Sequence, residues 1–270
     1  MIRTTTLAGA LAAALVLAAC ASSDDDTPPR GSLVEAPVTV TTQTATQINA
    51  STATTGLQGL SGLAKSDVKI VAINYNTIGP KGERTNASGV LLVPTSATCG
   101  TSMPLITYAK GTDVQKPRTL ASATDSETFL LIAMYASQCY VVVASDYLGF
   151  AKSTYPYHPY LHGDSEASSV IDALRAARNA ASTVGFGLSG KVMFTGYSQG
   201  GHASAFAQKN AERDNAGEFA IVGGAHLAGP YNVSGSLKST TAIAGYQYFA
   251  PYLANSYQKV YGDVWTDINA

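Results

Sequence analysis

Four short, uninterrupted apolar runs constrain the fold of this chain more than any other feature. They cover residues 105–109, 140–144, 192–195 and 219–222 and are rich in β-branched and aromatic side chains. Continuous rather than alternating runs are typical of strands that are covered on both faces. Helical segments lie between them, the clearest at 164–181. This alternation predicts an α/β fold with a mostly parallel, doubly covered sheet.

Two further strands and the overall composition complete this picture. Residues 68–77 and 87–93, separated by a Gly-Pro-Lys-Gly cluster, predict an antiparallel pair. Hydrophobic residues make up 46% of the chain and charged residues 13%, which excludes a disordered protein. The formal net charge of -1 gives no electrostatic basis for binding nucleic acid.

The first 19 residues predict a signal peptide for export. The apolar run 7–19 is too short to span a bilayer core and has the length of a signal-peptide core. It ends in Leu-Ala-Ala-Cys, which resembles a bacterial lipobox, so we expect Cys20 to be lipidated and to become the mature N-terminus. Ala21 then favours the outer membrane, with the protein facing the periplasm or the surface. The alternative is an ordinary signal peptide with a chance cysteine.

The region after the signal peptide is expected to be a flexible tether, over residues 20–56. Residues 21–32 are polar, acidic and interrupted by prolines. The Thr-rich stretch 39–55 is open between tether and early strand, and folding is expected to begin near Leu57. The core is predicted over 57–235, followed by an aromatic-rich tail over 236–270.

Two cysteines remain in the exported part of the chain. An oxidising compartment permits a disulfide between Cys99 and Cys139. The alternative is two unrelated buried thiols.

The motif Gly196-Tyr197-Ser198-Gln199-Gly200 carries the clearest chemical signal. The pattern G-x-S-x-G is weak alone, but here it ends a buried strand and opens a helix over 199–213. Such a turn is so tight that larger side chains two residues on either side would collide with it. It holds the serine oxygen at the carboxyl edge of the sheet, so Ser198 is a candidate nucleophile. The alternative is a glycine-rich turn without chemistry.

At these residues the sequence resembles the α/β-hydrolase superfamily, and within it the secretory lipase group. The string G-Y-S-Q-G-G-H at 196–202 matches the nucleophile elbow. Other matching strings are Y-N-T at 75–77, A-S-D-Y-L-G at 144–149 and H-P-Y-L at 158–161. The resemblance runs from about residue 68 to 231 and implies an α/β-hydrolase fold. Relative to that fold, the last strands of the core are expected to be absent.

The resemblance implies hydrolysis of carboxylic esters without a cofactor or metal. Ser198 would attack the acyl carbonyl and form an acyl-enzyme. The oxyanion would rest on the main-chain N–H of Gln199 and on that of Gly111 or Thr112. The family often has His where Lys110 stands. Small-molecule or lipid esters are the expected substrates, and the tail 236–270 is expected to begin a helical aromatic cap, with core packing as the plainer alternative.

The catalytic acid and base are not identified from the sequence. Asp146 is structural in the resembling family. Loop packing and capping explain His158 and His162 as well as catalysis would, and His202 and His226 are expected to be structural.

The order in this fold is Ser, then acid, then His. The carboxylates between Ser198 and His226 fall on the helix after the nucleophile or in its exit loop. They are Glu212, Asp214 and Glu218. The acid and base are therefore expected beyond Ala270, in a chain that is C-terminally truncated relative to the family.

Two functions from different classes follow. The first is a serine esterase or lipase anchored to the cell envelope. The second is a catalytically inactive, truncated hydrolase-like lipoprotein. A peptidase or acyltransferase with the same nucleophile is a third possibility.

Overall fold

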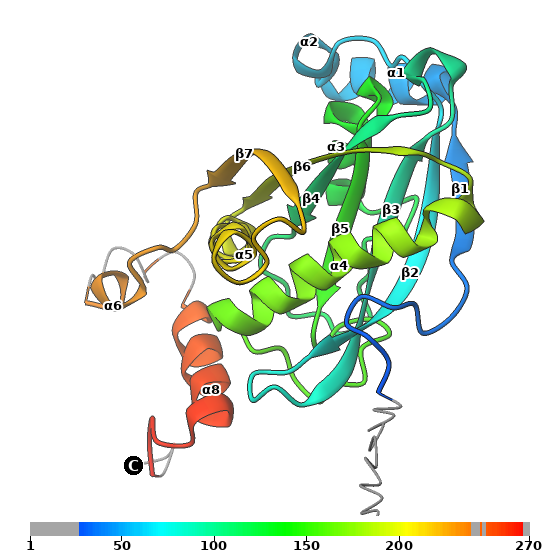
Figure 1. Ribbon diagram of the computed structural model, residues 1–270. Helices are drawn as coiled ribbons and strands as arrows, with labels where there is room; N and C mark the ends of the chain where they lie inside the picture. Colours follow the sequence, from blue (N-terminus) through cyan, green and yellow to red (C-terminus); the bar gives the residue numbers. More distant parts are fainter. Residues whose placement is uncertain (1–26, 239–243, 245–246, 267–270) are drawn as a thin grey trace, which may run out of the picture.

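The computed structural model describes residues 27–238, 244 and 247–266, and within them one sheet of seven strands (Figure 1). Its strand order is β1-β2-β3-β5-β4-β6-β7. The strands are β1 (Val38–Gln43), β2 (Val68–Ile78), β3 (Arg84–Pro94), β4 (Met103–Ala109), β5 (Val141–Tyr147), β6 (Leu188–Tyr197) and β7 (Ala220–Leu227).

The sheet is antiparallel on one side and parallel on the other. Strands β1, β2, β3 and β5 pair antiparallel, whereas β5, β4, β6 and β7 pair parallel. The predicted antiparallel pair is β2 with β3, and each of the four apolar runs lies in or at the start of a parallel strand. The expected α/β class is therefore confirmed, with a mixed sheet.

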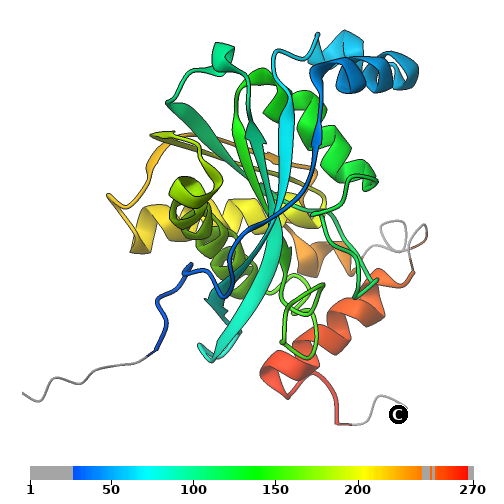
Figure 2. The same cartoon turned by 90° about the vertical axis from the view of Figure 1, so that its right-hand side faces the viewer.

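Helices cover both faces of this sheet. Figures 1 and 2 show α4 and α5 on one face and α3 on the other. The helices are α1 (Ala45–Thr55), α2 (Gln58–Ser61), α3 (Ser126–Met134), α4 (Gly163–Val184), α5 (Gln199–Asp214), α6 (Val233–Ser236) and α8 (Phe249–Tyr261), with short 3₁₀ turns η1 (Ala97–Cys99) and η2 (Ala136–Gln138).

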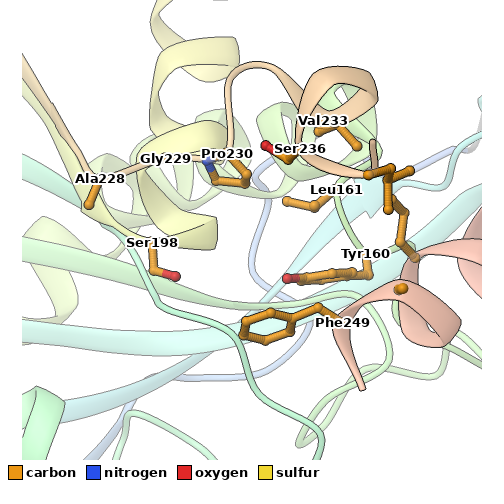
Figure 3. A pocket seen from close by; sticks show the side chains of 12 residues that line it. Tyr160, Leu161, Ser198, Ala228, Gly229, Pro230, Val233, Ser236 and Phe249 are labelled. Atoms are coloured by element: carbon orange, nitrogen blue, oxygen red, sulfur yellow. The ribbon is translucent and has the colours of Figure 1, made fainter. Parts of the chain in front are cut away.

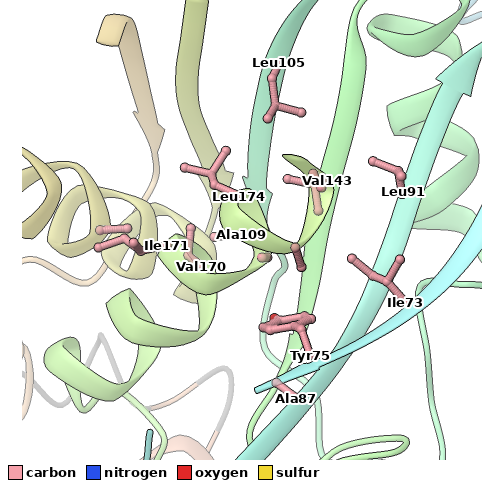
Figure 4. Packing of buried hydrophobic residues seen from close by; sticks show 14 of the residues in the cluster. Ile73, Tyr75, Ala87, Leu91, Leu105, Ala109, Val143, Val170, Ile171 and Leu174 are labelled. Carbon is pink, nitrogen blue, oxygen red and sulfur yellow. The ribbon is translucent and has the colours of Figure 1, made fainter. Parts of the chain in front are cut away.

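Two hydrophobic cores result, one on each face, because successive side chains of a strand point to opposite faces. On β5, Val143 packs toward α4 with Leu174 (Figure 4). Its neighbour Val142 belongs to the other core, with Ile48 of α1 and Leu131 of α3. All five side chains are at most 1% exposed. A sheet sandwiched in this way is a rigid support for loops at its carboxyl edge.

The expected tether over 20–56 is wrong in its second half. Strand β1 pairs with β2 along the edge of the sheet, and α1 follows it. The Thr44 side chain accepts the N–H of Gln47, and the Gln47 side chain accepts the N–H of Thr44, so α1 begins in a capping box. Ile48 then enters the core with 1% exposure. The folded part of the chain therefore begins well before Leu57.

The expected signal peptide and Cys20 lie outside the described residues. Within the described ranges, no helix is both long and apolar enough to cross a bilayer.

A disulfide joins Cys99 of η1 to Cys139, which follows η2. This is the pairing expected from the sequence. It ties the loop before β4 to the loop before β5, two parallel strands that are neighbours in the sheet.

Candidate active site

Ser198 occupies the tight turn between β6 and α5. Its backbone angles, φ 57° and ψ −123°, are ones that a residue with a side chain rarely adopts. The Ser198 N–H donates to the carbonyl of Leu227 at 2.9 Å, which ties the turn to the end of β7. The hydroxyl lies at the carboxyl edge of the parallel strands and faces a cavity (Figure 3).

The two glycines of the motif are required by close backbone approach. A Cβ on Gly196 would lie 2.2 Å from the carbonyl oxygen of Gly200. A Cβ on Gly200 would lie 1.8 Å from the carbonyl oxygen of Ala109, at the end of β4. The helix therefore begins directly against the neighbouring strand, as a nucleophile elbow requires.

The loop after β4 offers one free main-chain donor rather than two. The N–H of Gly111 donates to Glu127 Oε1 at 2.9 Å, so it is already engaged. The N–H of Thr112 makes no hydrogen bond in the part of the chain that the structure describes, while its hydroxyl pairs with Tyr160 at 3.2 Å. Gln199 opens α5, where N–H groups have no intrahelical acceptor. Of the expected donors, Gln199 and Thr112 therefore remain.

Two cavities meet at Ser198. The first, of about 230 Å³, is bounded by α6, α8 and the loop before α4, and its lining is mainly apolar (Figure 3). The second, of about 520 Å³, has a more polar lining. Side chains of the first include Tyr160, Leu161, Pro230, Val233, Phe249 and Leu253, and those of the second include Tyr108, Thr112, Arg118, Glu127, Tyr197 and Tyr248.

Arg118 connects the acidic groups around the second cavity. Its guanidinium donates to Asp125 and Glu127 at 2.9 Å each and to Asp113 at 3.3 Å. Burial raises the pKa of Asp113 and Asp125, but their hydrogen bonds and the nearby cations outweigh it, so both pKa values lie below normal. These ion pairs fix the loop between β4 and α3.

Lys110 is fully buried beside this loop. Its ammonium group lies 3.1 Å from the carboxylate of Asp113 and 3.9 Å from the ring centroid of Phe150. Burial lowers the pKa of Lys110, and the neighbouring carboxylates act in the opposite direction. Lys110 therefore packs inward and does not face the cavities at Ser198.

Asp146 braces a loop, the role expected for it. Its carboxylate accepts hydrogen bonds from Ser88, Thr119 and the N–H of Leu120, at 2.7, 2.9 and 2.8 Å. Burial raises its pKa, against the opposing effect of Lys110.

None of the four histidines, all of which the structure describes, bonds Ser198. His158 Nδ1 pairs with the carbonyl of Leu148 at 3.0 Å, and burial lowers the pKa of His158 to about 3. His162 caps α4, and His202 pairs with a carboxylate of α4. His226 pairs with the buried hydroxyl of Ser204 at 2.8 Å.

The three carboxylates that follow Ser198 are also engaged elsewhere. Glu212 accepts from Gln208, Asp214 pairs with Arg213, and Glu218 pairs with Arg175. The described residues thus bring together the candidate nucleophile Ser198 and two candidate main-chain donors, but no acid–base pair beside them.

Comparison with known proteins places this geometry in context. The family model for secretory lipases matches residues 114–264. Among solved structures, the rice cell wall degrading esterase LipA from Xanthomonas oryzae is 36% identical, with a TM-score of 0.80 over 90% of this chain and 63% of that one. Candida antarctica lipase A is 20% identical, with a TM-score of 0.61 over 90% of this chain and 52% of that one, and shares the fold. No curated protein matches.

The chain spans less than two thirds of the length of either solved structure, 63% of the esterase and 52% of the lipase.

Proposed function

Because the chain belongs to the secretory lipase family, we propose that it is a carboxylic ester hydrolase whose nucleophile is Ser198. The observation that carries this proposal is the strained backbone of Ser198 at the start of α5, next to two main-chain donors. Its hydroxyl oxygen attacks the ester carbonyl, and the oxyanion accepts hydrogen bonds from Gln199 and Thr112. The alcohol then leaves, and water releases the acid from the acyl-enzyme.

The two cavities divide the substrate. The acyl chain fits the apolar cavity between Leu161, Pro230 and Leu253, where burial of its methylene groups supplies binding free energy. The alcohol portion fits the second cavity near Thr112 and Tyr248. Esters of small molecules or lipids have an acyl chain for the first cavity and an alcohol portion for the second.

No general acid–base pair for this reaction is identified among the described residues. Each of the four histidines is held by a partner other than Ser198. Removal of a triad member leaves only weak catalysis from the oxyanion hole and from binding. The second candidate is therefore a hydrolase-like protein without turnover, and the pairing of all four histidines away from Ser198 is the observation in its support.

Reaction with a fluorophosphonate probe separates these candidates, because only an activated serine reacts quickly. We expect the wild-type chain to be labelled at Ser198 and the Ser198→Ala variant to be unlabelled. Ser204→Ala is the control, because Ser204 lies on the same helix and is fully buried. Absence of labelling in the folded wild-type chain would support the inactive alternative, and equal labelling of Ser198→Ala would refute the assignment.

Export and anchoring form the second part of the proposal. The secretory family supports export, and the cysteine after Leu17-Ala18-Ala19 supports lipidation at Cys20, hence an outer-membrane lipoprotein. Mass spectrometry of the mature N-terminus should find an acylated Cys20. An unmodified N-terminus further along the chain would contradict the anchor.

A further inference from the structure

Behind the nucleophile lies a buried polar cluster centred on Glu166 of α4, whose side chain is 1% exposed. One of its carboxylate oxygens, Oε1, accepts from the Gln199 side-chain amide at 2.6 Å and from the N–H of Leu161 at 3.0 Å. The other, Oε2, pairs with Nδ1 of His202 at 2.8 Å. The bonds to Gln199 and His202 join α4 to α5, and the bond to Leu161 joins α4 to the loop before it.

The proton positions in this cluster follow from its partners. His158 Nδ1 faces the carbonyl of Leu148, so it carries the proton, and Nε2 is left to accept from the Gln199 amide. The lowered pKa of His158, about 3 because of burial, keeps this ring neutral at ordinary pH. The Gln199 nitrogen must therefore face His158 and Glu166. Its amide oxygen has no partner among the described residues.

Two of the groups that Glu166 holds belong to the proposed active site. Gln199 supplies a main-chain N–H to the oxyanion in the proposed reaction, and its side chain, like that of His202, connects the cluster to α5. Leu161 lines the apolar cavity and has a positive φ of 56°, which is unfavourable for a residue with a side chain. Its N–H bond to Glu166 opposes relaxation of this strain.

We propose that Glu166 is a positioning residue that fixes the oxyanion donor Gln199 and the cavity wall at Leu161 relative to Ser198. Its carboxylate touches neither substrate nor the reacting atoms. It acts because the donor must lie within hydrogen-bonding distance of the oxyanion, and a displacement of about 1 Å can cost 100-fold in rate. This inference rests on the proposed function, and it assigns a support to the same site.

Two variants of Glu166 separate positioning from stability. In Glu166→Gln, the amide oxygen can still accept from both Gln199 and Leu161. The NH₂ group can donate to Nδ1 of His202 when the ring proton is on Nε2. Glu166→Ala removes all three hydrogen bonds. We expect Glu166→Ala to lower the maximal rate of fluorophosphonate labelling by roughly 10- to 100-fold, with little change in the half-saturating probe concentration. Glu166→Gln should recover most of that rate.

Ser204→Ala is the matched control, because it breaks a buried hydrogen bond one turn further along α5 and leaves the Glu166 cluster intact. All rates are compared per folded molecule, below the unfolding transition of each variant. A wild-type rate in Glu166→Ala would overturn the proposal. Equal losses in Glu166→Ala and Glu166→Gln would overturn it as well, because the acceptor geometry would then be irrelevant.

A second measurement does not require activity. The main-chain amide resonance of Gln199 should shift in Glu166→Ala, and should stay near its wild-type position in Glu166→Gln and Ser204→Ala. If the wild-type chain is not labelled, the proposed function fails, and this resonance alone decides the positioning role. An unchanged Gln199 resonance in Glu166→Ala would then refute it.

Discussion

Substitution of Gly200 by alanine tests the closest contact at the nucleophile turn. The added Cβ would lie 1.8 Å from the carbonyl oxygen of Ala109 and 2.8 Å from that of Lys110. Ordinary contacts of this kind begin at 3.4 Å, so the start of α5 must retreat from β4 by up to 1.6 Å, the difference between 3.4 and 1.8 Å. Gly200 follows Gln199 directly, so this movement carries the proposed oxyanion donor with it.

Two effects of different size follow from this displacement. Overpacking costs about 1–3 kcal/mol of unfolding free energy, which corresponds to roughly 2–12 °C in Tm for a domain of this size. Misplacement of the donor by more than 1 Å should lower serine reactivity by about 100-fold or more. We therefore expect a large loss of serine reactivity in a variant that is still folded.

Thermal unfolding by circular dichroism and the rate of fluorophosphonate labelling measure these two effects separately. Gly223→Ala is the control, because a Cβ on Gly223 of β7 would meet nothing within 4 Å. We expect this control to keep its labelling rate. A Gly200→Ala variant that labels at the wild-type rate would show that the close approach of α5 to β4 does not set the reactivity of Ser198.

The remaining predictions concern stability and association. The disulfide between Cys99 and Cys139 spans 40 residues, so its reduction should lower the unfolding free energy in urea by about 4 kcal/mol in the chain-entropy model, and an unchanged midpoint would contradict this. The low pKa of His158 means that the unfolded chain binds a proton that the folded chain does not. Stability should therefore fall by up to about 5 kcal/mol as the pH falls from 6.5 towards 3, and a His158→Asn variant should show a flatter dependence. In the described residues β7 pairs on one side only, and its Val222 is 56% exposed, so the chain should self-associate. Val222→Lys should reduce that association in light scattering, and equal association would exclude this edge as its origin.

The parts of the fold that the sequence predicted are those set by local patterns. Strands β4, β5 and β6 are buried on both faces, so each shows as a continuous apolar run. The turn at Ser198 shows because the approach of α5 to β4 admits only glycine at 196 and 200. Such constraints act within a few residues and can be read without knowledge of the partner strands.

The sequence left the region of strand β1 open between tether and strand, because the stability of β1 comes from its partner rather than from burial. Val38 and Val40 are 53% and 44% exposed, so no hydrophobic pattern distinguishes β1 from a tether. Its main-chain hydrogen bonds to β2 stabilise it in place of side-chain burial. The capping box at Thr44 and Gln47 was the one local signal for α1, since a Thr followed three residues later by Gln is typical of a helix start.

The groups that contact the proposed oxyanion donors and their loop could not be predicted, because each is distant in sequence from the residue it contacts. From the sequence, Gly111 and Thr112 are equivalent candidates. In the structure, Glu127 of α3 accepts the N–H of Gly111, which leaves Thr112. Glu166 has an ordinary local role as an acid in the first turn of α4, favourable to the helix dipole, and nothing near it indicates a partner 33 residues later in Gln199. A motif points to the candidate nucleophile because its backbone is locally constrained. The proposed supports of the oxyanion donors are set by long-range packing, so they emerge only from the folded structure.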